Sequence, residues 1–186
     1  MPDGARLRGG ALVLTLPNAI TFARLCSVPL AVWLVLRGDM ADGFWLFVAA
    51  GLSDALDGWL ARRGHGSAVG AVLDPMTDKA MLVSMYVTLA AAHVLPFWIA
   101  ILVVFRDLLI VGGVLALAVL GQAVTIHPLF ISKLNTALQI ILIACAMLEN
   151  GYGLRVPHLV DSLVVVVAAS TIASGAAYVG KAAVWR

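Results

Sequence analysis

Six apolar segments, each about as long as a helix that crosses a membrane, take up nearly the whole of this 186-residue chain. A helix needs roughly 20 predominantly apolar residues to cross the hydrocarbon core of a bilayer. Hydrophobic residues make up 62% of the chain and charged residues only 12%, against roughly 25% charged residues in soluble domains. The sequence therefore predicts an all-α integral membrane protein with a single domain over residues 1–186.

Glycine, proline and asparagine mark the breaks between the apolar segments. We expect six transmembrane helices near residues 18–37, 42–61, 72–93, 96–120, 129–149 and 157–180. No internal repeat or linker-like stretch divides the chain. The first segment contains Arg24 and no small-residue cleavage site follows it, so we expect a retained helix rather than a signal peptide.

Basic residues are distributed unequally between the two ends of these predicted helices. With six spans and a cytoplasmic N-terminus, one side receives eight of them and the other side two, and Lys and Arg favour the cytoplasmic side. Both termini are therefore expected to be cytoplasmic. The net charge of +2 gives no support for a nucleic-acid partner. Arg24 and Arg106 lie inside predicted spans and need acidic or phosphate partners there.

Four aspartates lie near the predicted cytoplasmic ends of the second and third helices. Asp54 and Asp57 are three residues apart, and Asp74 and Asp78 are four apart. Both spacings place a pair of side chains on one face of a helix. A short link joins the two helices, so we expect antiparallel neighbours whose acid pairs face each other. Acids at membrane depth are costly and usually functional, and divalent cations would hold four of them together.

The residue types in this region suit a phosphoryl or pyrophosphate group. Oxygen ligands without cysteine or histidine favour Mg²⁺ or Mn²⁺, and two such ions would neutralise phosphate oxygens and stabilise a leaving group. Gly58 and Gly70 leave room for a nucleotide beside the backbone, and Arg62 can offer its planar guanidinium to a phosphate. One acid could act as a base, for which Asp78 is the natural candidate.

The motif reads DALDGWLAR at residues 54–62 and GAVLDPMTD at residues 70–78. This pattern resembles the signature of the CDP-alcohol phosphotransferases, six-helix membrane enzymes that transfer a phosphatidyl or related group from a CDP-linked donor to an alcohol and release CMP. The link between Arg62 and Gly70 is shorter than is usual in that family, which should tighten the turn.

The resemblance implies a role for each residue of the motif. Two divalent cations, Mg²⁺ or Mn²⁺, would be held by the four acids Asp54, Asp57, Asp74 and Asp78. Asp78 would also deprotonate the acceptor hydroxyl. The CDP moiety would be contacted by Gly58, Ala61, Arg62 and Gly70. A homodimer is expected on the same resemblance. We expect a bacterial inner membrane protein, and the distribution of Lys and Arg predicts that its active site faces the cytoplasm.

Segments outside the motif resemble the branch of the family that forms phosphatidylglycerophosphate or cardiolipin. Residues 131–139 are most similar to the CMP-forming, eukaryotic-type cardiolipin synthases. We therefore expect CDP-diacylglycerol as the donor, phosphatidylglycerol as the acceptor and CMP as a product, with glycerol 3-phosphate as the alternative acceptor. A lipid phosphate or the acceptor would be contacted by Arg24, Arg106, Lys133 and Asn135.

Each of these four residues also has a purely structural interpretation. Arg24 and Arg106 could pair with nearby acids, Lys133 could be a cytoplasmic anchor, and Asn135 could form a hydrogen bond between helices. A cation transporter is the alternative from a different functional class. The acids lie at one predicted surface rather than at the midplane, and no span has an inverted copy, both of which disfavour a transporter.

Overall fold

Six helices form the part of the chain that the computed structural model describes, namely residues 16–60, 68–119, 130–154 and 156–184. Side chains are described at residues 22–56, 77–113, 130–154 and 156–180. The helices are α1 (Leu16–Arg37), α2 (Met40–Leu60), α3 (Ala68–Ala91), α4 (Phe97–Val119), α5 (Phe130–Tyr152) and α6 (Leu159–Val184). These described segments contain no strand. The predicted six-helix architecture is confirmed, with boundaries that differ from expectation by a few residues.

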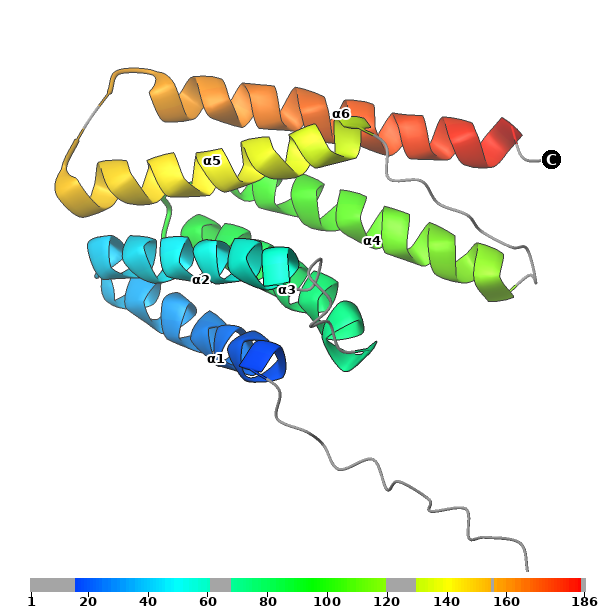
Figure 1. Ribbon diagram of the computed structural model, residues 1–186. Coiled ribbons are helices and arrows are strands. Elements are labelled where there is room, and N and C mark those ends of the chain that lie inside the picture. The colour runs from blue at the N-terminus through cyan, green and yellow to red at the C-terminus, as the bar shows by residue number, and fades with distance from the viewer. Residues whose placement is uncertain (1–15, 61–67, 120–129, 155, 185–186) are drawn as a thin grey trace, which may run out of the picture.

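The helices pack side by side in an order that differs from their order in the chain. α1 packs against α2 and α3, α5 packs against α2 and α6, and α4 packs against α3 and α6. These pairs close a ring, and α3 also touches α5 across the middle of it. In Figure 1, α1 and α6 therefore lie at opposite edges of the bundle.

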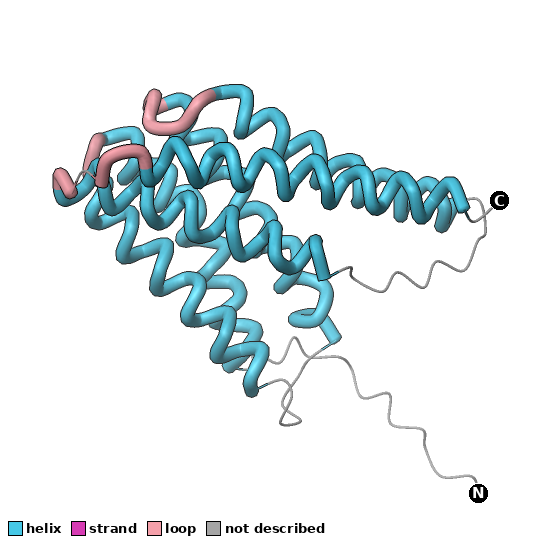
Figure 2. The backbone as a smooth tube through the Cα atoms, turned by 90° about the horizontal axis from the view of Figure 1, so that it is seen from above, coloured by secondary structure: helices cyan, strands magenta, loops and turns pink. Residues whose placement is uncertain are grey.

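The two ends of the bundle differ in chemistry. The three turns that the structure describes lie together at one end (Figure 2). The apolar core fills this half, and its largest fully buried members are Met85, Tyr86, Leu89, Ile99, Leu142, Ile143 and Met147. The other half buries polar and charged side chains, among them Arg24, Thr77, Arg106, Asp107, Asn135 and Ser174.

The turns after α1 and α3 have the same hydrogen-bonding pattern. After α1, the N–H of Gly38 donates to the carbonyl of Val35 and the N–H of Asp39 donates to the carbonyl of Leu34, both at 3.0 Å. Gly38 has φ 88°, and His93 has φ 57° at the corresponding position after α3. This Schellman arrangement satisfies the last helical carbonyls and reverses the chain within a few residues.

The backbones of α2 and α5 approach each other closely at the end of the bundle that carries the turns. A Cβ atom added to Gly151 would lie 2.7 Å from the backbone nitrogen of Ala41. Beside this contact, the indole N–H of Trp45 donates to the hydroxyl of Tyr152 at 2.8 Å. The absence of a side chain at Gly151 therefore allows the contact that fixes α2 against α5.

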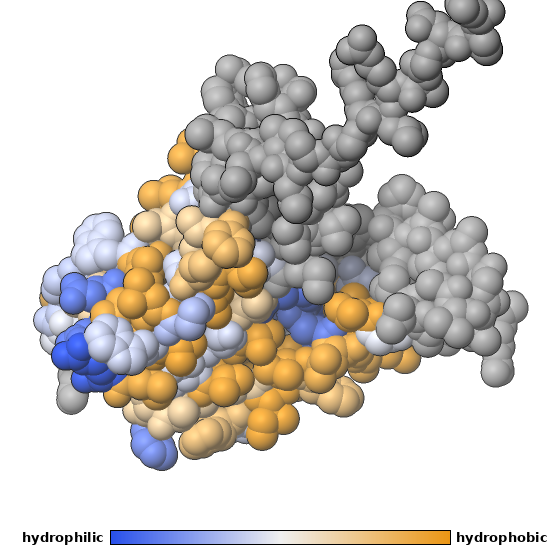
Figure 3. Space-filling model, turned by 90° about the horizontal axis from the view of Figure 1, so that it is seen from below, coloured by the Kyte–Doolittle hydropathy of each residue, from blue (hydrophilic) through white to orange (hydrophobic). Residues whose placement is uncertain are grey.

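Much of the outer surface is apolar. Figure 3 shows hydrophobic residues over most of the described surface in that view, with hydrophilic residues mainly at one end and a smaller hydrophilic area near the middle. Large side chains such as Ile101 (68% exposed), Phe105 (62%) and Phe130 (80%) point outward. By length and hydropathy, two helical segments in the described part qualify as membrane spans, Phe130–Tyr152 and Leu159–Gly180. The six-span topology and the cytoplasmic termini stay predictions.

Replacing Gly151 with alanine should destabilise the bundle, because the new methyl group would force the α2 backbone away from α5. We expect the free energy of unfolding to fall by about 1–3 kcal/mol, the usual cost of overpacking. Thermal unfolding of the detergent-solubilised protein measures the effect. Gly51→Ala in α2 is the matched control, because a Cβ there meets no described atom within 4 Å. Equal melting temperatures for the two variants would contradict this interpretation.

Candidate active site

Arg24 joins two acids of the sequence motif across three helices. Its Nη1 donates to Oδ1 of Asp54 at 2.9 Å and to Oδ1 of Asp78 at 3.1 Å. Arg24 belongs to α1, Asp54 to α2 and Asp78 to α3. The arginine side chain is only 2% exposed, whereas the side chains of Asp54 and Asp78 are 43% and 40% exposed. The guanidinium therefore lies in the interior, behind two carboxylates that reach the surface.

This arrangement differs in one respect from the sequence expectation. The second and third helices were expected to face each other as direct neighbours. In the described part of the bundle, α2 and α3 instead each pack along α1 and are not among the closely packed pairs. The two acids meet because Arg24 of α1 attracts both of them.

The geometry of the two acids fits a bound cation. Carboxylates from different helices converge on a single positively charged nitrogen, and oxygen ligands of this kind suit Mg²⁺ or Mn²⁺. Among the side chains that the structure describes, no three His, Cys, Asp or Glu residues gather at one point. Asp57 lies in α2 and Asp74 in α3, but their side chains are outside the described residues. The four-acid metal site stays a prediction.

Two of the residues expected to contact the CDP moiety, Gly58 and Gly70, lie at the ends of α2 and α3 that the link joins. Gly58 is in the last turn of α2 and Gly70 is in the first turn of α3. Ala61 and Arg62 are outside the described residues. The helix boundaries thus place the motif on both sides of the link between α2 and α3, and the nucleotide contacts stay predictions.

A second set of polar contacts begins at Lys79 of α3. Its Nζ lies 3.0 Å from Oδ2 of Asp107 in α4. The other oxygen of Asp107 accepts from Nη1 of Arg106 at 2.7 Å. Nη2 of Arg106 donates to the hydroxyls of Ser132 in α5 and Ser174 in α6, both at 2.6 Å. Arg106 therefore has protein partners on three helices, as its structural interpretation required.

Asn135 and Lys133 differ sharply in their surroundings. Asn135 is fully buried, and its Oδ1 accepts hydrogen bonds from Ser170 at 2.7 Å and Thr171 at 2.9 Å, so that it links α5 to α6. Its side-chain nitrogen has no partner among the described residues. Lys133 is exposed on α5. Contact of either residue with a lipid phosphate or an acceptor stays a prediction.

Together the two sets of contacts touch all six helices in the polar half of the bundle. Sequence reasoning identified Arg24 and the pairing of Arg106 with a nearby acid, here Asp107, but missed the roles of Lys79, Ser132 and Ser174. A cationic partner for Asp107 such as Lys79 could have been sought, because opposite charges inside apolar helices require partners. The two serines carried no comparable signal, since serine is common in membrane helices.

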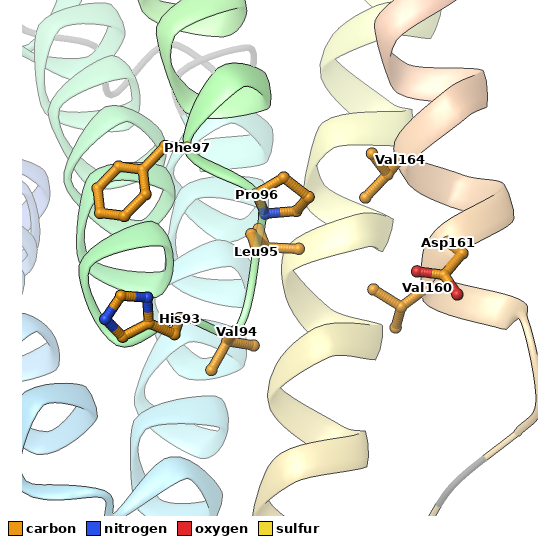
Figure 4. A pocket seen from close by; sticks show the side chains of 8 residues that line it. All are labelled: His93, Val94, Leu95, Pro96, Phe97, Val160, Asp161 and Val164. Carbon is orange, nitrogen blue, oxygen red and sulfur yellow. The ribbon is translucent and has the colours of Figure 1, made fainter.

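A surface hollow of about 330 Å³ lies away from these polar contacts, at the turn between α3 and α4 and the start of α6 (Figure 4). It is lined by His93, Val94, Leu95, Pro96, Phe97, Val160, Asp161 and Val164. This place is at the end of the bundle that carries the turns, opposite Arg24 and its acids. The hollow is therefore not the candidate active site.

Comparison with known proteins identifies the family. The model of the CDP-alcohol phosphatidyltransferase family matches residues 14–177, so the chain belongs to this family. It is 43% identical over 112 residues to the cardiolipin synthase (CMP-forming) of Streptomyces coelicolor, which covers 55% of this chain and 52% of that protein. It is 33% identical over 182 residues to a cardiolipin synthase (CMP-forming) and mitochondrial hydrolase fusion protein of Schizosaccharomyces pombe, covering 89% of this chain and 31% of that protein.

A third relative carries a different name. The probable phosphatidylglycerophosphate synthase of Mycobacterium tuberculosis is 31% identical over 191 residues, covering 97% of this chain and 88% of that protein. By contrast, the chain spans about half or less of the Streptomyces and Schizosaccharomyces proteins. The relatives of this chain thus carry two different names within one family.

Arg24→Gln should make the protein more dependent on divalent cations for its stability. The variant removes the positive charge that Asp54 and Asp78 share, so their mutual repulsion must be relieved by another cation. We expect unfolding to be easier by about 1–3 kcal/mol, the scale of a charge-assisted hydrogen bond, and the loss to be larger in EDTA than in Mg²⁺. Thermal unfolding under both conditions tests this, with Arg37→Gln at the opposite end as control. An equal loss with and without Mg²⁺ would count against a cation at these acids.

Proposed function

We propose that the protein is a CMP-forming cardiolipin synthase, which transfers a phosphatidyl group from CDP-diacylglycerol to phosphatidylglycerol. The observation that carries this proposal is the convergence of Asp54 and Asp78 on the guanidinium group of Arg24. It occurs in a chain that belongs to the CDP-alcohol phosphatidyltransferases. The relatives named cardiolipin synthase support the choice of acceptor. Membership of this family also removes the ground for the cation-transporter alternative.

The proposed chemical step is a substitution at phosphorus. A terminal hydroxyl of the acceptor glycerol forms a bond to the phosphorus that bears the diacylglycerol. The bond from that phosphorus to the oxygen bridging the two phosphates breaks, and CMP leaves with the bonding electrons. The hydroxyl proton passes to the carboxylate of Asp78, a group 40% exposed in the structure and therefore open to an incoming acceptor.

Two divalent cations, Mg²⁺ or Mn²⁺, would be held by the four acids and would neutralise charge on the pyrophosphate. Charge balance is consistent with this role. Arg24, Lys79 and Arg106 carry three positive charges, and Asp54, Asp78 and Asp107 carry three negative charges. These six charged residues are therefore neutral as a set, and Asp57 with Asp74 would add two negative charges. Two divalent cations would reverse that excess to +2, which matches a dianionic pyrophosphate.

The apolar outer surface supports a membrane location for the reaction. Soluble monomers rarely expose large contiguous apolar patches, whereas hydrophobic side chains cover much of the outside of this bundle (Figure 3). Both proposed substrates are diacylated and would reach the acids from the bilayer. We propose six spans, with the acid end toward the cytoplasm of a bacterial inner membrane, on the basis of the uneven distribution of Lys and Arg. A homodimer stays a proposal from the family resemblance.

Phosphatidylglycerophosphate synthase is the second candidate function. It is favoured by one observation, the Mycobacterium relative that aligns with 97% of this chain and carries that name. The donor, the metal site and the role of Asp78 would be unchanged. The two activities differ only in whether the acceptor is phosphatidylglycerol or glycerol 3-phosphate.

Incubation of the purified protein with CDP-diacylglycerol, Mg²⁺ and phosphatidylglycerol should yield cardiolipin and CMP in equal amounts. Glycerol 3-phosphate should be a poor acceptor under the same conditions. Lipid chromatography together with CMP quantification measures both outcomes. Formation of phosphatidylglycerophosphate without cardiolipin would assign the second candidate function instead, and no CMP release with either acceptor would contradict the proposal as a whole.

Asp78→Asn should separate catalysis from donor binding. The amide keeps the shape of the carboxylate but cannot accept the hydroxyl proton, so turnover should fall by about 10²–10⁴-fold, the usual contribution of a general base. Affinity for CDP-diacylglycerol should change much less. Excess EDTA should abolish the turnover of the wild-type protein, and Mg²⁺ or Mn²⁺ should restore it. Near-normal turnover of the variant at neutral pH would exclude Asp78 as the base.

A further inference from the structure

Lys79 is a half-buried cation that pairs with a buried acid. Its side chain is 43% exposed, whereas that of its partner Asp107 is 12% exposed and that of Arg106 is 5% exposed. The ammonium group has three N–H donors, and the Nζ–Oδ2 contact at 3.0 Å accounts for one of them. Part of this ammonium group therefore faces outward, on the same helix as Asp78.

The local charge at this place is positive. Asp107 supplies one negative charge and is shared by two cations, Arg106 and Lys79. Arg106 is buried, and its two terminal nitrogens already donate to Asp107, Ser132 and Ser174. The excess positive charge of this group is therefore presented to the surface by Lys79. A partly exposed positive charge that is paired with a buried acid suits an anionic ligand such as a phosphate.

The position of Lys79 relative to Asp78 matches the acceptors that the proposed function requires. Successive residues of a helix point about 100° apart, so Asp78 faces α1 and Arg24 while Lys79 faces α4 and Asp107. Phosphatidylglycerol and glycerol 3-phosphate both have a three-carbon glycerol between their phosphate and their terminal hydroxyl. A phosphate at Lys79 would therefore leave that hydroxyl free to reach toward Asp78.

We propose that Lys79 binds the phosphate of the acceptor, and that Asp107 and Arg106 are positioning residues that hold Lys79 for this purpose. This inference rests on the proposed function and adds a residue to which no role had been assigned. It also changes the expected role of Arg106, whose terminal nitrogens are occupied by protein groups. Its influence on the acceptor is then exerted through Asp107 and Lys79.

Lys79→Gln tests the proposal with little risk to folding, because Asp107 keeps its contact with Arg106 at 2.7 Å. The apparent KM for the acceptor should rise about 10-fold, the loss that corresponds to one charge-assisted hydrogen bond. The kcat, the KM for CDP-diacylglycerol and the melting temperature should stay close to wild type. Lys79→Arg should restore most of the acceptor affinity. Arg37→Gln, which removes an exposed cation at the opposite end, should change none of these quantities.

A binding measurement separates this proposal from the proposed function. Thermophoresis of the full chain in detergent with Mg²⁺ should show that Lys79→Gln weakens the binding of dihexanoyl phosphatidylglycerol, and that added salt weakens binding to the wild type more than to the variant. Parallel titrations with glycerol 3-phosphate and CDP-diacylglycerol identify which phosphate Lys79 contacts. Loss of affinity for either acceptor but not for the donor supports the proposal.

Three results would overturn the proposal. These are weaker binding of CDP-diacylglycerol alone, unchanged acceptor binding, or a loss of activity that follows a lower melting temperature. If the wild-type protein releases no CMP but binds phosphatidylglycerol through Lys79, the proposed function fails and the phosphate site stands. If the wild type forms cardiolipin and Lys79→Gln has an unchanged acceptor KM, the function stands and the phosphate site fails.

Discussion

The pairing of Arg24 with Asp54 and Asp78 is the interaction on which the polar half of the bundle depends. A buried cation without partners costs several kcal/mol, so α1 can bring Arg24 into the bundle only where acids from its neighbours meet it. The arginine is buried and the acids are partly exposed, which suits the weaker hydration of a guanidinium. In this way α1 sets the distance between the two halves of the motif, although it contributes no acid of its own.

The apolar half of the bundle supports this arrangement from the other end. The turns after α1 and α3 reverse the chain with satisfied carbonyls, and α2 meets α5 at Gly151 with almost no space between the backbones. The fully buried residues Met85, Leu142 and Met147 fill the space between the helices in this half. Because the helices are fixed there, the opposite ends can hold groups that repel or attract one another without separating the bundle.

The sequence was sufficient for the helices but not for the order in which they pack. Apolar length and chain breaks are local properties, so the six helices could be placed within a few residues. The insertion of α1 between α2 and α3 depends on contacts between distant segments, and a short link indicates only that two helix ends are close. For this reason the need of Arg24 for an acidic or phosphate partner was predictable, while its pairing with both Asp54 and Asp78 was not. In the same way, the pairing of Arg106 with Asp107 was predictable from the sequence, whereas the choice of Lys79 as the second partner depends on how α3 packs against α4.

Adjacent residues of α3 separate the acidic contacts from the basic ones. Asp78 points toward Arg24, which also binds Asp54, and Lys79 points toward Asp107 on the other side of the helix. A reaction that joins two phosphate-bearing lipids must bring negative charges close together. The donor pyrophosphate and the acceptor phosphate therefore need separate positive charges, which the proposed cations at the acids and Lys79 would supply. Because Asp78 and Lys79 are neighbours on α3, the proposed metal site and the proposed phosphate site would lie a fixed distance apart. The contact of Asp78 with Arg24 of α1 and that of Lys79 with Asp107 of α4 both oppose rotation of α3 about its own axis, which would disturb the two proposed sites together.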